Sequence, residues 1–230
     1  MLANITLSQI GLWIVYISLP ILVLYFIYLF FSRAFRYMGF SSIEAFIILF
    51  VSFLFGVDII ILGVNISNIY LFSYGNWNLW INMGGAIIPI LLSIYLIIKK
   101  KLPLKNIAVG IIIVTIIAFL VTHPNENKGI VAIIPYAFLP ALFASITSMI
   151  LSWNDFIKAA PLAYISGTIG VLIGADFLHL WELLNIPIND KINAVIGGAD
   201  VFDMIFITGI IAVVLDGLIM FRQRKNINIT

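Results

Sequence analysis

The sequence has no cysteine, and it has few charged residues for its length. The absence of cysteine excludes disulfides, thiolate chemistry and cysteine-based zinc sites. Only 10% of the 230 residues are charged, whereas about a quarter are charged in ordinary soluble domains. The chain is 63% hydrophobic, with a mean hydropathy of +1.18. This composition excludes a soluble domain and predicts a protein embedded in the lipid bilayer.

Motifs of common soluble enzymes and of nucleic-acid binders are also missing. The chain contains no P-loop, GxSxG, HExxH or dinucleotide-binding fingerprint. We therefore predict no cofactor. The net charge is +2, and the cations stand in small clusters at the ends of apolar runs. We therefore expect no nucleic-acid partner.

Seven apolar segments follow one another along the chain, most of them near the roughly 20 residues that a membrane-spanning helix needs. They cover residues 9–31, 43–63, 79–98, 107–122, 130–152, 159–181 and 199–221. The first has no basic region or small-residue cleavage site before it, so we expect a retained span. The predicted fold is all-α: a polytopic, multi-pass protein of the cell membrane. We expect about seven transmembrane helices in a single integral-membrane domain over residues 1–230.

Lysine and arginine residues sort the loops into two sets. The clusters that follow spans 1, 3, 5 and 7 are Arg33 with Arg36, Lys99–Lys101 with Lys105, Lys158, and Arg222 with Arg224 and Lys225. The loops on the opposite side carry only Lys128 and Lys191. Because cations favour the cytoplasmic side, we predict an outside N-terminus and a cytoplasmic C-terminus.

Spans 1–3 and spans 5–7 share three sequence landmarks in the same order. The paired landmarks are residues 19–22 and 139–142, 56–58 and 174–176, and 84–86 and 197–199. The spacing from proline to aspartate is 38 residues in one half and 36 in the other. This pattern predicts a parallel 3+1+3 repeat with halves 9–98 and 130–221 and a connector helix over 107–122. Duplication of a mere packing unit is the alternative.

Small residues mark two further features. Ala163, Gly167, Gly170 and Gly174 form a stripe that predicts tight packing of span 6 against a neighbouring helix. The glycine pairs at 84–85 and 197–198 predict helix breaks whose freed backbone groups line a cavity.

Aspartates interrupt the apolar runs at Asp58, Asp176, Asp200 and Asp203. A carboxylate inside a membrane span is costly, by about 3 kcal/mol on insertion scales. Asp58 and Asp176 each stand five residues before the outer end of a predicted span, roughly 8 Å below that boundary. We expect them to share a polar pocket in the outer half of the membrane. The alternative is that each acid caps a broken helix or reaches outward to water. A further aspartate, Asp216, is expected to be solvated or paired near the cytoplasmic end.

Two neighbours could serve these acids. Asn65 lies seven residues after Asp58, and His179 lies three residues after Asp176. Both spacings place the two side chains on one helix face. Asp176 and His179 are too few ligands to predict a metal site, so the metal question stays open.

The depth of Asp200 and Asp203 is ambiguous. Hydropathy puts both near the outer surface, where they would be solvated caps. The repeat alignment instead pairs Asp203 with Ile90, about eleven residues into a span. At that depth Asp203 could approach Asp176 and form a carboxylate pair.

Three apolar blocks of the chain carry a resemblance. The blocks are IGADFLHL, INMGGAIIPILLSIYL and IGGADVFDMIFITGIIAVVL. They resemble an uncharacterised prokaryotic, largely archaeal, integral-membrane family defined by a domain of unknown function, from about Gly56 onward. The resemblance implies the same membrane fold and no particular activity. A glycine often stands in that family where Asp200 stands here, which makes Asp176 and Asp203 the better candidates.

A fainter resemblance is to the intramembrane aspartyl proteases of the presenilin and signal-peptide-peptidase group. Residues 197–200 (GGAD) are similar to the Gly-x-Gly-Asp signature, but Ala199 replaces its second glycine. Residues 140–142 read Pro-Ala-Leu, although they precede the acids here and follow them in that group. No tyrosine precedes Asp176. A protease of this type would need Asp176 and Asp203 to share a proton and to activate a water molecule between them.

Three classes of function follow from these patterns. The first is a transporter or channel for a proton, a cation or a small solute; its binding residues would be Asp58, Asn65, Asp176, His179, Asp200 and Asp203. The second is an intramembrane aspartyl protease that uses Asp176 and Asp203. The third is a membrane scaffold or assembly factor whose acids pair with a basic partner. The solute and the oligomeric state are left open.

Overall fold

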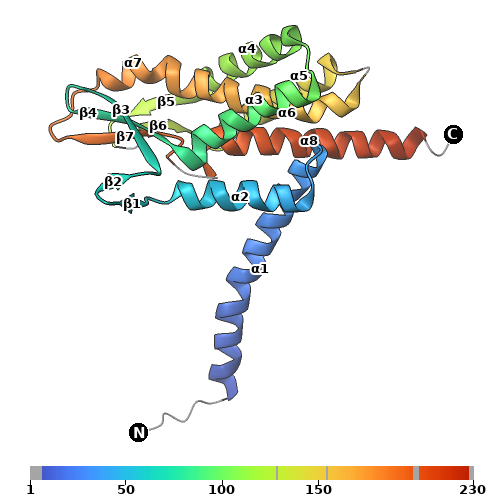
Figure 1. Ribbon diagram of the computed structural model, residues 1–230, viewed down its shortest axis with the longest axis horizontal. Coiled ribbons are helices and arrows are strands. Elements are labelled where there is room, and N and C mark those ends of the chain that lie inside the picture. Colours follow the sequence, from blue (N-terminus) through green and yellow to red (C-terminus); the bar gives the residue numbers. More distant parts are fainter. Residues whose placement is uncertain (1–6, 128, 154, 199–201, 228–230) are drawn as a thin grey trace.

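The fold is mostly helical, and its helices follow the order of the seven apolar segments (Figure 1). The structure is a computed structural model that describes residues 7–127, 129–153, 155–198 and 202–227. The helical segments are α1 (Leu7–Tyr37), α2 (Ser42–Gly56), η1 (Met83–Ile87) with α3 (Ile88–Lys100), α4 (Leu104–Val121), η2 (Tyr136–Phe138) with α5 (Leu139–Leu151), α6 (Phe156–Val171) with η3 (Leu172–Phe177) and α7 (Leu178–Leu184), and α8 (Met204–Ile227).

Four of these helical stretches are long and apolar enough to cross a bilayer, by length and composition. They are Leu12–Tyr37, Met83–Lys100, Leu104–Val121 and Ile157–Leu184. The other three, Ser42–Gly56, Tyr136–Leu151 and Met204–Ile219, are apolar but shorter. The described helices therefore have the character of a membrane protein, as the composition predicts.

The all-α prediction was wrong in one respect, because short strands occupy several connections. The strands are β1 (Ile60–Ile61), β2 (Val64–Asn65), β3 (Asn68–Tyr74), β4 (Trp77–Asn82), β5 (Thr122–Asn125), β6 (Gly129–Ala132) and β7 (Ile192–Ile196). β1–β2 and β5–β6 are antiparallel hairpins, and the third sheet has the order β3-β4-β7. Gly63, in the turn between β1 and β2, and Gly75, in the turn between β3 and β4, adopt positive φ. Glycine adopts this conformation without steric cost.

Several predicted spans are shorter than expected for the same reason. The second was predicted to run to residue 63, but α2 ends at Gly56, because Val57 is extended. The third was predicted to begin at residue 79, where the chain is still in β4. An apolar run rich in isoleucine and tyrosine suits a strand as well as a helix, so hydropathy alone does not separate them.

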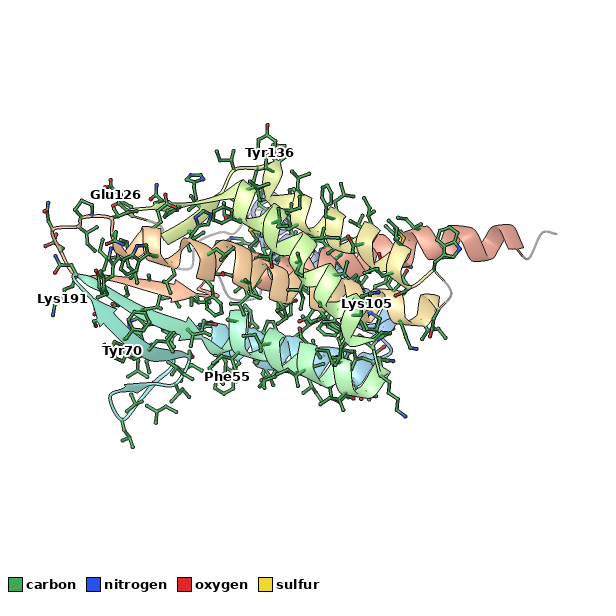
Figure 2. The ribbon with its side chains drawn as sticks, turned by 90° about the horizontal axis from the view of Figure 1, so that it is seen from above. Phe55, Tyr70, Lys105, Glu126, Tyr136 and Lys191 are labelled. Carbon is green, nitrogen blue, oxygen red and sulfur yellow. The ribbon has the colours of Figure 1, made fainter. Side chains whose placement is uncertain are left out.

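All described strands lie at one end of the helical bundle, which we call the strand end (Figure 1). Tyr70, Glu126 and Lys191 lie toward this end, and Lys105 lies well away from it (Figure 2). α1 leaves the bundle at a steep angle, and most of its apolar side chains from Leu12 to Phe26 are exposed. Such a surface requires lipid or another apolar cover.

α6 is the central helix of the bundle and packs against α3, α4, α5 and α8. The small-residue stripe explains how closely its neighbours approach. A Cβ atom on Gly167 would lie 3.1 Å from the Gly209 Cα atom of α8, and one on Gly170 would lie 2.6 Å from the Val114 Cβ atom of α4. The predicted tight packing of span 6 is confirmed.

Candidate functional site

The candidate site is built from two carboxylates on different helices. Asp176 lies in η3, a π-helical turn between α6 and α7. Gly174 packs against the backbone carbonyl of Thr115 in α4, so the turn lies close to that helix. π-helical turns inside α-helices are frequent at functional sites. Asp176 is half-buried there, next to the buried Ala175.

Asp203 lies directly before α8 and caps it. Its Oδ1 atom accepts the Ile205 N–H at 2.9 Å, and its backbone carbonyl accepts the Ile207 N–H at 2.8 Å. Aspartate is a preferred residue at this helix position. Asp203 is half-buried, so it combines features of both expectations, a helix cap and a neighbour of Asp176.

The structure brings these two side chains together. Both residues line the same two cavities. Ile130 of β6 is the only other described residue that lines both. The carboxylate pair therefore stands where the cavities adjoin.

The first cavity, which we call the strand-side cavity, has a volume of about 390 Å³. All five residues of β7 line it, together with Leu180 and Leu183 of α7. Asn127 and Asn193 add polar groups. This cavity connects the carboxylate pair with the strand end.

The second cavity, which we call the lateral cavity, has a volume of about 340 Å³. Its lining comes mainly from the η2–α5 segment, η3 and α8 and is mostly apolar, with Thr122 and Thr208 as polar residues beside the two acids. Three of its apolar residues are also strongly exposed on the protein surface: Ile134 by 75%, Phe138 by 51% and Phe202 by 56%. Ala141, the middle residue of the Pro-Ala-Leu sequence, also lines this cavity.

Asp58 is not part of this arrangement. It is exposed, follows the end of α2, and lines neither cavity. Its Oδ1 atom accepts the side-chain amides of Asn65 at 3.0 Å and Asn68 at 2.5 Å. Asn65 does contact Asp58, but through the β1–β2 hairpin and not along a helix face. The expectation of a shared pocket with Asp176 was wrong, because α2 ends before residue 58 and the chain turns into strands.

His179 is buried but faces a different helix. Its Nδ1 atom lies 3.2 Å from Glu182 Oε2, and its Nε2 atom lies 3.0 Å from the Phe119 carbonyl oxygen. The imidazole stacks on the Phe119 ring with 4.5 Å between centroids. His179 lines neither cavity. The i,i+3 spacing from Asp176 did not bring them together, since the intervening π-helical turn departs from α-helical geometry.

Two other predictions concern the ends of the bundle. Asp200 lies outside the described residues. Asp216 was expected to be solvated or paired, and the prediction that it is solvated was wrong, because the residue is fully buried. Its carboxylate accepts hydrogen bonds from Ser145 Oγ at 2.5 Å and Ser148 Oγ at 2.8 Å. The serines of span 5 were the available signal, because they stand on the buried face of α5.

The glycine pair at 84–85 has a different role from the predicted helix break. It lies in the π-helical turn η1, and it is fully buried. A Cβ atom on Gly84 would collide with the Ser52 carbonyl oxygen of α2. The close contact between η1 and α2 explains the need for glycine there.

Metal coordination is not indicated by the described part of the chain. It contains no group of three or more histidine, aspartate or glutamate side chains that could hold a metal ion. Catalytic zinc sites use three protein ligands, and the pair of Asp176 and Asp203 falls short of that number.

The fold and the site define a helical membrane protein with paired carboxylates between two cavities. The chain belongs to the family described as "Protein of unknown function (DUF1614)", whose model matches residues 69–215. The matched region includes both Asp176 and Asp203 and begins after Asp58. The expected membership of an uncharacterised family is thereby confirmed. Neither the curated proteins nor the solved structures give a match to this chain.

Proposed function

We propose that this protein is an intramembrane hydrolase of the aspartyl type that cleaves peptide bonds of membrane-embedded substrates. The observation that carries this proposal is the position of Asp176 and Asp203, which come from different helices and meet where two cavities adjoin. Paired carboxylates that share one proton activate water in aspartic proteases. Two like charges at close range cannot both ionise without a large cost.

The surroundings of the two acids suggest separate roles. Asp203 accepts the Ile205 N–H at the start of α8, and a helix N-terminus stabilises negative charge. Asp203 is therefore the ionised partner, and Asp176 carries the shared proton.

Hydrolysis would then proceed in two balanced steps. Asp203 takes a proton from a water molecule while the water oxygen bonds to the substrate carbonyl carbon, and Asp176 gives its proton to the carbonyl oxygen. The resulting diol collapses: the C–N bond breaks, the amine nitrogen takes a proton from Asp203, and Asp176 recovers its own from the diol.

The two cavities suit the two reactants. Water reaches the pair through the strand-side cavity, which carries the polar side chains Asn127 and Asn193. A peptide from the bilayer enters through the lateral cavity, whose rim carries the exposed apolar residues Ile134, Phe138 and Phe202. The Pro-Ala-Leu sequence adds support, because Ala141 stands in the lateral cavity together with both acids.

The experiment is peptide cleavage by the full chain reconstituted in lipid vesicles with a panel of synthetic transmembrane peptides. We expect Asp176→Asn and Asp203→Asn each to lower the cleavage rate by about 100-fold or more, as loss of a general acid or base does. Asp58→Asn is the matched control and retains most of the rate, since Asp58 lines neither cavity. Mass spectrometry of the products provides the measurement, and cleavage that persists in both pair variants would overturn the proposal.

A transporter of protons, cations or small solutes is the second candidate, and the order of elements favours it. In each proposed half a strand directly precedes the third helical segment, β4 before η1–α3 and β7 before α8, and these two strands pair in parallel. Parallel strands are what two halves with one orientation would present. In a transporter, Asp176 and Asp203 would bind the ion, and Asp58 would not, because it lines neither cavity.

Proton flux in the same vesicles tests the transporter hypothesis. Flux in the wild type that disappears in Asp176→Asn, without peptide cleavage, would favour transport.

The proposed topology has seven spans, an outside N-terminus and a cytoplasmic C-terminus. The position of the strands supports it, because every described strand lies in a connection that the cation pattern predicts to be outside. The third class, a scaffold or assembly factor whose acids pair with a basic partner, stays a prediction.

A further inference from the structure

β7 is the outer strand of its sheet, and no described strand pairs with its second edge. The sheet has the order β3-β4-β7, and β7 runs parallel to β4 from Trp77 opposite Ile192 to Ile81 opposite Ile196. The Ile192 N–H donates to the Asn76 carbonyl at 3.0 Å, on the β4 side. Bonding residues alternate along a parallel strand pair, as side chains do along each strand. The backbone groups of residues 193 and 195 therefore point away from β4.

A neighbouring contact supports this assignment. The Val195 carbonyl accepts the Gly198 N–H at 3.2 Å, in the turn that follows the strand. Among the bonds between described residues, three backbone groups on the outer edge of β7 have no backbone partner: the N–H and the carbonyl of Asn193 and the N–H of Val195. An added strand could pair with these two donors and one acceptor through its own backbone carbonyl and N–H groups.

The strand and the carboxylate pair share one cavity. Every residue of β7 lines the strand-side cavity, and so do Asp176 and Asp203. The remaining lining is largely apolar, with Leu180 and Leu183 of α7 among its residues. Both acids also line the lateral cavity. A chain that enters through the lateral cavity would therefore pass the acids and then lie along β7 in the strand-side cavity, next to the water that reaches the pair there.

We propose that the outer edge of β7 binds an extended, uncharged peptide segment as an added strand and presents its peptide bond to Asp176 and Asp203. This inference rests on the proposed hydrolase function and names how its substrate is held. Strand addition supplies affinity through main-chain hydrogen bonds and is a recurring mode of peptide recognition. Unpaired backbone groups near lipid are costly and gain from such a partner. The leucine, isoleucine and alanine lining suits apolar substrate side chains.

The protein side of the test uses Val195, whose N–H lies on the outer edge. Val195→Pro removes this donor and leaves the bonds to β4 in place, because proline is tolerated at strand edges. Val195→Ala shortens the same side chain and keeps the N–H. It therefore measures how much of the change in cleavage rate comes from the side chain alone. We expect Val195→Pro to lower peptide cleavage by about two- to tenfold relative to Val195→Ala, as the loss of one main-chain hydrogen bond implies.

The substrate side uses matched pairs of ten-residue, valine-rich peptides with and without one backbone N-methyl group, each carrying a photoreactive label. N-methylation at alternate positions should lower both cleavage and cross-linking to residues 192–196. Cleavage that is insensitive to N-methylation and to Val195→Pro overturns strand addition and leaves the hydrolase standing. If the wild type cleaves nothing, cross-linking decides: a cross-link that weakens in Val195→Pro supports the peptide site alone, and its absence overturns it.

Discussion

Four aspartates at or near the apolar segments, Asp58, Asp176, Asp203 and Asp216, are accommodated in three different ways. Asp58 avoids the interior and accepts two asparagine amides on an exposed hairpin. Asp176 and Asp203 share a boundary between two cavities. Asp216 is fully buried between α8 and α5. Buried acids need such partners, because an isolated carboxylate in an apolar environment costs several kcal/mol.

The serines around Asp216 allow a prediction at the residue scale. Ser145→Ala removes the donor that lies 2.5 Å from the Asp216 carboxylate at a site without solvent access. We expect the free energy of unfolding to fall by about 1–3 kcal/mol, the cost of leaving a buried acceptor unsatisfied. Ser18→Ala is the control, since Ser18 is exposed and bonds only the Val15 carbonyl of its own helix; it should change stability by about 0.5 kcal/mol at most. Denaturant unfolding in detergent micelles is the measurement, and equal effects of both variants would contradict this account.

The π-helical turns are the elements that shape the site. η3 carries Asp176 between α6 and α7, and η1 packs Gly84 directly on the backbone of α2. In both turns a glycine stands where a neighbouring helix comes too close for a Cβ atom. The position of each turn is therefore determined by helix–helix contact, and the acid in η3 depends on that contact.

Gly174 tests this dependence at the element scale. A methyl group at Gly174 would collide with the Thr115 carbonyl oxygen, which is backbone and cannot rotate away. We expect Gly174→Ala to destabilise the protein by about 1–3 kcal/mol, as overpacking does, and to displace Asp176 enough to lower cleavage. Gly110→Ala is the matched control at the same helix pair, because its methyl group would meet the side chain of Ser166. Stability and cleavage rate are measured together, and a Gly174→Ala variant that is no worse than Gly110→Ala would argue against the contact.

At the scale of the whole molecule, strands and helices separate along the bundle. The strands gather at one end, and α1 projects from the bundle with exposed apolar side chains (Figure 1). The carboxylate pair lies between this strand end and the packed helical core around Phe35, Tyr164 and Phe206.

The proposed orientation can be tested by cysteine labelling, since the native chain has no cysteine. Ser73 lies in β3 at the strand end and Lys105 lies at the start of α4, and both are exposed. A membrane-impermeant maleimide should label Ser73→Cys in intact cells and label Lys105→Cys only after permeabilisation. Labelling of Lys105→Cys alone in intact cells would reverse the topology.

The sequence by itself determined the membrane character, the order of the helices and the small-residue packing of α6, because these depend on side-chain hydropathy and size read locally. It also singled out Asp176 and Asp203 as the better candidates, through the resemblance to the family. Their actual proximity stayed one of two alternatives, since the depth of Asp203 depends on where α8 begins.

Only the tertiary structure decided which residues meet. β4 and β7 pair across more than 100 residues of chain, and hydropathy does not report such backbone pairing. For the same reason hydropathy placed Asp58 and His179 in the site, where the structure does not have them. Asp58 follows the early end of α2, and His179 follows the π-helical turn η3. Asp216 is buried because two serines of another helix satisfy it. Contacts between distant elements, and not local composition, assign each acid its place.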